Sequence, residues 1–210
     1  MSFEFLTKIL NIPLERFAVT VFEGDQDAEQ DNEAATIWED LGIKKTRIAF
    51  LPKKDNWWGP AGKTGPCGPD TEIYFDRGES YDKRGKELIA DDIENERYIE
   101  IWNIVFSQYN SKVGLSRENY PELPNKNIDT GAGLERFTCV IQQVETNFET
   151  DLFMPTIKHV EEISKVKYQG QMAFKVIADH IKALVFAISD GAMLSNEGRG
   201  YVLRRLLRRA

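Results

Sequence analysis

The segment Tyr98–Tyr109 restricts the fold of this chain more than any other. It reads YIEIWNIVFSQY and is long, largely apolar and rich in β-branched and aromatic residues, which favours a strand. A strand of this composition is covered on both faces, so it belongs inside a sheet rather than at an edge. The rest of the sequence must therefore supply strands that pair with it.

Patterns of period 2 and period 3.6 divide the residues before about position 150 into strands and helices. Strands are predicted at 16–22, 47–51 and 71–76, and a further strand ends at Asp129. Helices are predicted at 3–10, 25–41 and 133–144, whereas 78–96 is a charged surface excursion. The acidic residues between 23 and 40 are interpreted as the first turn and solvated face of the second helix, where they suit the helix dipole.

Beyond residue 150 the pattern is helical only. Amphipathic helices are predicted at 152–164, 171–189 and 199–209, the last with Ser195 as its N-cap. A sheet region followed by a helical region is typical of an α+β protein. We predict two domains, residues 1–150 and residues 151–210.

Composition and charge limit the possible partners. The 210 residues carry a net charge of -7, which argues against a surface that coats nucleic acid everywhere, but arginines cluster after residue 198 and can meet a polyanion. The longest apolar runs are too short to span a bilayer. Two cysteines and two histidines give neither a disulfide framework nor a zinc site built by the protein. A reducing cytoplasm is the expected location.

The segment Asp129–Arg136, DTGAGLER, is the strongest local signal of a functional site. A carboxylate ends a strand, two glycines allow close approach of the backbone, and an arginine follows on the first turns of a helix. Asp129 can pair with an ammonium group, and Arg136 can hold a phosphate. A Gly-x-Gly turn between a strand and a helix is by itself a weak signal, and it is also compatible with a purely structural turn.

The segment Asp55–Pro69, DNWWGPAGKTGPCGP, is predicted to be a loop with an unusual backbone path because it is dense in glycine and proline. It is either a rigid surface loop with buried tryptophan anchors or the wall of a pocket in which Trp58 contacts a small ligand. Cys67 has no evident histidine partner, so we interpret it as a packing residue.

Asn103 is a lone amide within the apolar strand. It is either part of a satisfied core network or a ligand for the polar end of a substrate. In a regular strand the spacing places Glu100 on the opposite face from Asn103, so a twist or bulge is needed for both to serve one site.

Considered together and in order, these segments resemble the alanyl-tRNA synthetase family of class II aminoacyl-tRNA synthetases. The resemblance covers nearly the whole chain. The segments that carry it are AVTVFE (18–23), TGPCGP and TEI (64–69 and 71–73), IWNIVF (101–106), DTGAGLER (129–136), VIADHI (176–181) and NEGRGYVLRR (196–205).

The resemblance implies part of a class II antiparallel sheet flanked by helices, followed by the start of a helical domain that recognises the tRNA acceptor stem. It implies an alanine–tRNA ligase, which activates alanine with ATP and transfers it to tRNA, with ATP and Mg²⁺ as cofactors. The implied alanine pocket consists of Trp58, Asn103, Val105, Asp129 and Gly131.

The resemblance also implies roles for individual residues. Asp129 and Arg136 are the implied catalytic residues, with Asp129 on the ammonium group of alanine and Arg136 on an ATP phosphate. Gly133 and Glu100 are further candidates for the ATP site, and Glu100 is a candidate for carrying Mg²⁺. Asn196 resembles the residue that inspects a wobble pair in the acceptor stem. The implied contacts to tRNA are Asn196, Arg199, Arg204, Arg205 and Arg208.

Two further family signatures are expected before residue 1, and the chain stops at Ala210. We therefore expect a truncated synthetase core with little or no activity alone, whose partner is the remainder of the synthetase polypeptide. Two alternatives stay open. One is a non-catalytic module that grips tRNA acceptor stems through the arginine-rich helix, and the other is a degenerate paralogue whose pocket binds another small amine.

Overall fold

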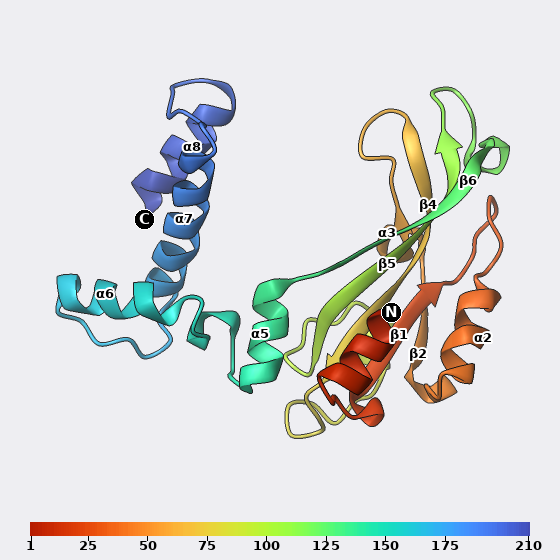
Figure 1. The fold of residues 1–210 in the computed structure, drawn as a ribbon, viewed down its shortest axis with the longest axis horizontal. Helices are drawn as coiled ribbons and strands as arrows, with labels where there is room; N and C mark the ends of the chain where they lie inside the picture. The colour runs from red at the N-terminus through yellow and green to blue at the C-terminus, as the bar shows by residue number, and fades with distance from the viewer. The chain divides into compact units, whose positions relative to one another are not determined.

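The computed structural model describes residues 1–210, which form two compact units, Met1–Arg136 and Phe137–Ala210. The first unit contains the whole sheet, and the second contains only helices and short turns (Figure 1). The predicted α+β class is confirmed. The division into domains at 1–150 and 151–210 stays a prediction.

The first unit is built on a sheet with the strand order β2-β1-β4-β5-β6, and a short strand, β3, pairs with β4 beside this path. β1 and β2 are parallel, and the other neighbours are antiparallel. β5 lies between β4 and β6, as its apolar composition predicts. The strands are β1 (Phe17–Phe22), β2 (Ile48–Leu51), β3 (Trp57–Trp58), β4 (Gly65–Asp76), β5 (Tyr98–Ser111) and β6 (Glu122–Ala132).

Short helices accompany the sheet. They are α1 (Ser2–Glu4), which continues as a π-helical turn at Phe5–Ile9, α2 (Asn32–Asp40), α3 (Lys53–Asn56) and α4 (Glu87–Ala90). Trp38 on α2 donates a hydrogen bond of 2.9 Å from Nε1 to the hydroxyl of Thr71 on β4, which joins this helix to the sheet. α4 lies in the predicted surface excursion, yet it buries Leu88 and Ile89 against Ala18, Ala49, Leu51 and Tyr98.

The predicted helix at 25–41 is too long, because α2 begins only at Asn32. The carboxylate of Asp25 accepts hydrogen bonds from the backbone N–H groups of Asp27 and Ala28 at 2.9 and 3.2 Å. The carboxylate of Asp31 accepts one from Ala34 at 2.9 Å and caps the helix. Aspartates that bind nearby backbone in this way compete with helix formation. The acidic residues from Asp25 to Asp31 therefore form a loop.

The second unit contains most of α5 (Leu134–Gln142), which begins in the first unit, together with α6 (Met154–Ser164), α7 (Met172–Ser189) and α8 (Gly198–Arg209). Phe153 and Ile157 pack against Phe174 and Ala178 of α7. α8 packs against α7. None of the helices combines the length and the apolar character needed to cross a bilayer.

The predicted N-cap of the last helix is wrong. Glu197 occupies the N-cap position, without a side-chain capping bond. The hydroxyl of Ser195 instead donates to the carbonyl of Glu197 at 2.7 Å, which closes a turn before the helix.

Asp76, the last residue of β4, forms a buried ion pair. Asp76 is 2% exposed, and its carboxylate accepts hydrogen bonds from Arg97 at 2.7 and 2.8 Å, from Arg47 at 2.9 Å and from the N–H of Gly78 at 2.8 Å. Burial alone would raise the pKa of Asp76, but the bonds from Arg97, Gly78 and Arg47 outweigh it and hold the pKa below its usual value.

We predict that Asp76→Asn lowers the free energy of unfolding of the first unit by about 3 kcal/mol at pH 7, because two arginines lose a buried counter-charge. A lowered pKa contributes stability above the unfolded pKa and loses it as pH falls, so the deficit shrinks below about pH 4. All four tryptophans lie in this unit, so urea unfolding followed by tryptophan fluorescence measures it. Asp92→Asn, at an exposed pair with Lys54, is the control; an equal loss in both variants would contradict the prediction.

Candidate functional site

Two rows of cross-strand neighbours bring the predicted pocket residues onto one face of the sheet. Strands β4, β5 and β6 are paired in register, and residues two apart on a strand point to the same side. The predicted residues on β5 and β6 therefore lie beside two carboxylates on β4. The rows are Glu72–Asn103–Gly131 and Asp70–Val105–Asp129.

Glu100 reaches the same face because of an irregularity in β5. The pairing slips by one residue between Ile73–Trp102 and Tyr74–Glu100, so β5 has one residue more than β4 at this point. Such a bulge reverses the side to which the following residues point. The sequence analysis required a twist or bulge for Glu100 and Asn103 to share a site, and the structure contains such a bulge.

Asp70 and Glu72 are carboxylates that the sequence analysis did not assign to the site. Asp70 is 4% exposed and accepts a hydrogen bond of 2.9 Å from Nδ2 of Asn56. Burial raises the pKa of Asp70 to about 6. Burial, followed by the nearby charge of Glu100, raises the pKa of Glu72 to about 7. The sequence did contain a signal for them: Asp70 and Glu72 are two residues apart on one strand, so their side chains point to the same face.

Hydrogen bonds order the centre of this face. The carboxylate of Glu72 accepts from the hydroxyl of Tyr74 at 2.9 Å and from Nδ2 of Asn103 at 3.5 Å. The hydroxyl of Thr130 donates to the carbonyl of Asn103 at 2.9 Å and ties β6 to β5. Asn103 therefore stands between a carboxylate and the strand that carries Asp129.

Arg136 provides the positive charge at the edge of the carboxylate face. Its Nη1 lies 2.5 Å from Oε2 of Glu100 and 3.3 Å from the backbone carbonyl of the same residue. The arginine side chain stays about half exposed, at 48%. A Cβ added at Gly133 would make only ordinary contact with Arg136, at 3.6 Å. Arg136 is thus held near Glu100 and remains accessible to an anion.

Trp58 and Asp129 border one groove of about 580 Å³. Trp58 is 41% exposed and comes from β3, while Asp129 comes from β6. The other lining residues are Ala61, Gly62, Thr64, Gly65, Pro66, Ser107 and Asn127. An added Cβ at Gly131 would meet no atom within 4 Å, so this glycine leaves open space in the neighbouring row. Val105 is 5% exposed and is the cross-strand neighbour of both Asp70 and Asp129.

The predicted loop at Asp55–Pro69 is partly regular. Asn56 ends α3, Trp57 and Trp58 form β3, and β4 begins at Gly65. β3 pairs with β4 through Trp57–Pro69 and Trp58–Gly68, so the tryptophans start a hairpin that walls the groove. Cys67 is fully buried, and burial raises the pKa of its thiol, which agrees with a packing residue.

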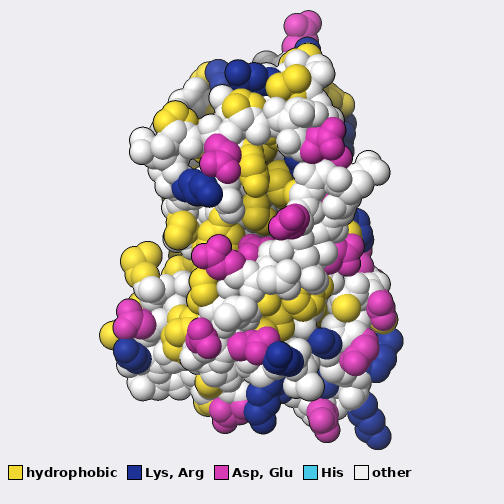
Figure 2. Space-filling model, turned by 90° about the vertical axis from the view of Figure 1, so that its right-hand side faces the viewer, with side chains coloured by type: hydrophobic (Ala, Val, Ile, Leu, Met, Phe, Trp, Pro, Cys, Tyr) yellow, Lys and Arg dark blue, Asp and Glu magenta, His cyan; other side chains and the backbone are white.

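The charges of the first unit contrast with those of α8. Figure 2 shows a face of mixed charge, with Asp and Glu side chains spread among exposed hydrophobic ones and Lys and Arg side chains gathered mainly along its lower part. In the second unit, by contrast, one face of α8 forms a small basic groove of about 210 Å³. It is lined by Tyr201, Arg204, Arg205, Arg208 and Arg209. Arg199 does not line this groove, because helical spacing turns it to the other side of α8.

Asn196 lies just before α8 and accepts a hydrogen bond at Oδ1 from Nη1 of Arg204. The loop that carries Asn196 lies so close to the helix that a Cβ at Gly200 would come within 2.4 Å of the carbonyl of Met193. Gly200 therefore permits the approach that places Asn196 beside the arginines.

Comparison with known proteins identifies relatives of the whole chain. The model of the family "tRNA synthetases class II (A)" matches residues 1–210. Alanine–tRNA ligase of Acholeplasma laidlawii is 63% identical over 211 residues, covering 100% of this chain and 24% of the ligase. The alanine–tRNA ligases of Onion yellows phytoplasma and Lactococcus lactis subsp. cremoris (strain SK11) are 57% and 53% identical, covering 100% and 94% of this chain. The chain spans about a quarter of the length of the first two relatives.

We predict that Glu72→Gln flattens the pH dependence of stability. A carboxylate with a raised pKa contributes stability that is present below its unfolded pKa and lost as pH rises through the folded value, here about 7. At pH 8 the variant should therefore be more stable than the parent, by roughly 1–3 kcal/mol. Urea unfolding followed by tryptophan fluorescence from pH 4 to pH 8 measures this. Glu94→Gln, at an exposed position, is the control, and parallel pH profiles for parent and Glu72→Gln would refute the prediction.

Proposed function

The chain belongs to the class II (A) tRNA synthetases, and from that premise we propose that it supplies the alanine-binding face of an alanine–tRNA ligase. The observation that carries the proposal is the arrangement of β4, β5 and β6. It sets Asn103, Val105, Asp129 and Gly131 on one face, beside a groove bordered by Trp58. The relatives whose names state this activity are 52–63% identical to the chain.

The face suits a small amino acid that enters with its ammonium group toward the sheet. Asp129 takes the ammonium as an exposed carboxylate, and Asp70 and Glu72 add negative potential behind it. Trp58 and Val105 supply the apolar surface that meets a methyl group. The open space at Gly131 admits the ligand, whereas the tryptophan wall limits the length of its side chain.

ATP binds on the side of Arg136 in this proposal, with Gly133 leaving the backbone accessible. Activation requires a carboxylate oxygen of alanine to attack the α-phosphorus in line, as pyrophosphate leaves. Arg136 stabilises the charge that develops on the phosphate, while Asp129 fixes the amino acid by its amine. In this step Arg136 gives up its hydrogen bond to Glu100 and binds the phosphate instead. The reaction needs no nucleophile from the protein.

Mg²⁺ fits the charge of this site. Burial, followed by the nearby charge of Glu100, raises the pKa of Glu72. Glu100 is paired with Arg136, which stays about half exposed. No group of three or more His, Cys, Asp and Glu side chains is placed to hold a metal ion. Glu100 and Glu72 would therefore hold the ion jointly with the oxygens of ATP, and the ion would neutralise phosphate charge.

α8 and the loop before it form the tRNA contact in this proposal. Arg204, Arg205 and Arg208 line one basic groove that can follow a phosphate backbone, and Asn196 at its edge meets a base. Arg199 contacts the nucleic acid from another side of the helix. The partner is the acceptor stem of a tRNA specific for alanine, and the working compartment is the cytoplasm.

The proposal is tested by exchanging the matching segment of the Acholeplasma laidlawii ligase for this chain. We expect the grafted enzyme to catalyse alanine-dependent ATP–pyrophosphate exchange. Asp129→Asn should lower kcat/KM for alanine by about 100-fold or more, because the ammonium loses its counter-charge. Asp92→Asn, away from the site, should leave exchange unchanged. Exchange that glycine or serine supports better than alanine would favour a degenerate site for another amine and refute the proposal.

The tRNA contact has a separate prediction. Arg205→Ala in the grafted enzyme should weaken tRNA binding several-fold and reduce the slope of log affinity against log salt by about 1. Asn196→Ala should leave this slope unchanged and reduce discrimination between acceptor stems. Filter binding over a salt series measures both effects. Tight tRNA binding with no adenylate formation would favour the non-catalytic binding module. An unchanged salt slope and affinity in Arg205→Ala would contradict the proposed contact at α8.

A further inference from the structure

Arg117 is a buried arginine with no part in the proposed chemistry. Its side chain is 4% exposed, and its Nη2 pairs with Asp25 and lies 3.7 Å from Asp27. Its Nε and Nη1 are buried without a hydrogen-bond partner. A buried guanidinium with unpaired N–H groups lowers the stability of the fold. We therefore expect the function of Arg117 to lie in the side chains that it contacts.

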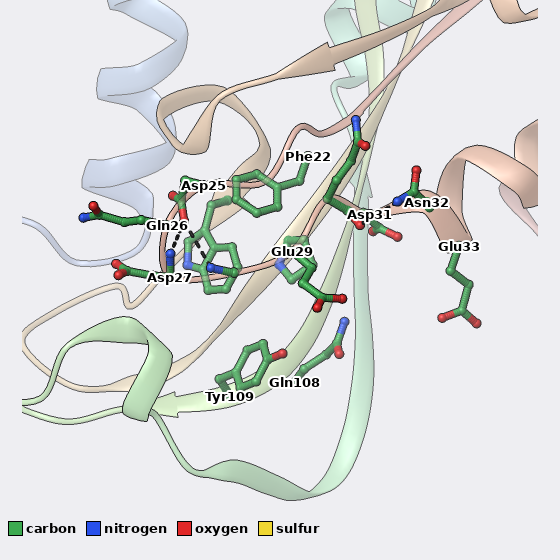
Figure 3. A pocket seen from close by; sticks show the side chains of 14 residues that line it. Phe22, Asp25, Gln26, Asp27, Glu29, Asp31, Asn32, Glu33, Gln108 and Tyr109 are labelled. Atoms are coloured by element: carbon green, nitrogen blue, oxygen red, sulfur yellow. Dashed lines mark hydrogen bonds between the residues drawn. The ribbon is translucent and has the colours of Figure 1, made fainter.

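The guanidinium of Arg117 packs on the ring of Trp57. Its carbon atom lies 4.5 Å from the centre of that ring and 5.8 Å from the centre of Phe22. Trp57 also meets Phe22 edge-on at 5.4 Å and stacks on Tyr109 at 5.9 Å with an interplanar angle of 14°. Figure 3 shows Phe22 and Tyr109 on the wall of an open cavity, with Asp25 and Asp27 at its side. The ring of Trp57 is therefore in contact with one cation and two aromatic rings.

Trp57 is joined directly to the wall of the proposed alanine pocket. Trp57 and Trp58 make up the two-residue strand β3, and neighbouring residues of a strand point to opposite sides. One tryptophan therefore enters the Arg117 cluster while the next borders the groove with Asp129. Trp58 pairs with Gly68, where an added Cβ would come within 2.0 Å of the carbonyl of Phe106, so the hairpin lies close against β5.

The other side of β3 has its own anchor. Asn56 is fully buried, and its Nδ2 donates at 2.9 Å to the hydroxyl of Thr20 and to the carboxylate of Asp70. That anchor fixes the backbone that enters β3 through Thr20 and Asp70. The Trp57 ring itself is contacted by Arg117, Phe22 and Tyr109.

We propose that Arg117 is a positioning residue, which holds Trp57 and thereby sets the place of Trp58 and the size limit of the amino-acid pocket. Arg117 acts through Trp57 and does not touch the substrate. The loop at 25–31 contributes through Asp25, which keeps the guanidinium oriented over the ring. This inference rests on the proposed function for its consequence, but its structural content concerns the position of Trp58 alone.

Substrate selectivity tests the consequence in the grafted enzyme. We expect Arg117→Met to raise KM for alanine and to reduce the preference for alanine over 2-aminobutyrate, which is one methylene longer, by about tenfold. KM for ATP should not change. Arg117→Lys should restore part of the preference, because it keeps the charge but lacks the planar group. Arg97→Met is the matched control, since it removes another buried arginine and should lower stability without changing the preference.

The position of Trp58 is tested on the 210-residue chain without any activity. 5-Fluorotryptophan gives four ¹⁹F resonances, one for each tryptophan, which single Trp→Phe variants assign. Arg117→Met should shift the resonances of Trp57 and Trp58 and leave those of Trp38 and Trp102 in place. An unmoved Trp58 resonance would overturn the inference, whether or not the grafted enzyme is active. A grafted parent without alanine-dependent exchange would overturn the proposed function and leave this test standing.

Discussion

The register between β4, β5 and β6 is the constraint on which the site depends. Each residue of interest is a cross-strand neighbour of another, so a slip by one position would turn the whole set to the opposite face of the sheet. The bulge opposite Tyr74 is the single departure that brings Glu100 to the same side. Thr130 reinforces this pairing, since its hydroxyl donates to the carbonyl of Asn103 and accepts from the indole of Trp102.

This arrangement concentrates negative charge. Asp70, Glu72, Glu100 and Asp129 share one face with the guanidinium of Arg136. Burial, followed by the charge of Glu100, raises the pKa of Glu72 there. Clustered carboxylates of this kind repel one another and attract cations. An ammonium group and a divalent ion are the ligands that relieve it, which is why the geometry and the family membership lead to the same proposal.

The sequence alone predicted the class of the fold and the interior place of β5, because composition is a local signal. It ended the last strand at Asp129, which is wrong: β6 continues to Ala132, because Thr130, Gly131 and Ala132 pair with β5. It could not place Glu100, since the bulge arises from pairing with a distant strand. Asp70 and Glu72 were missed because their importance comes from burial and from each other. The helix at 25–41 was predicted too long because the side chains of Asp25 and Asp31 bind nearby N–H groups, and helical periodicity does not report such bonds.

The contact between Asn196 and Arg204 fixes the polarity of the amide that faces away from the helix. A guanidinium has only donors, so it must take the oxygen of the side-chain amide and leave the nitrogen outward. The exposed amide nitrogen can then donate hydrogen bonds to an acceptor atom of a ligand. Arg204 thus contributes more than charge, because it decides whether the exposed part of the Asn196 side chain donates or accepts hydrogen bonds.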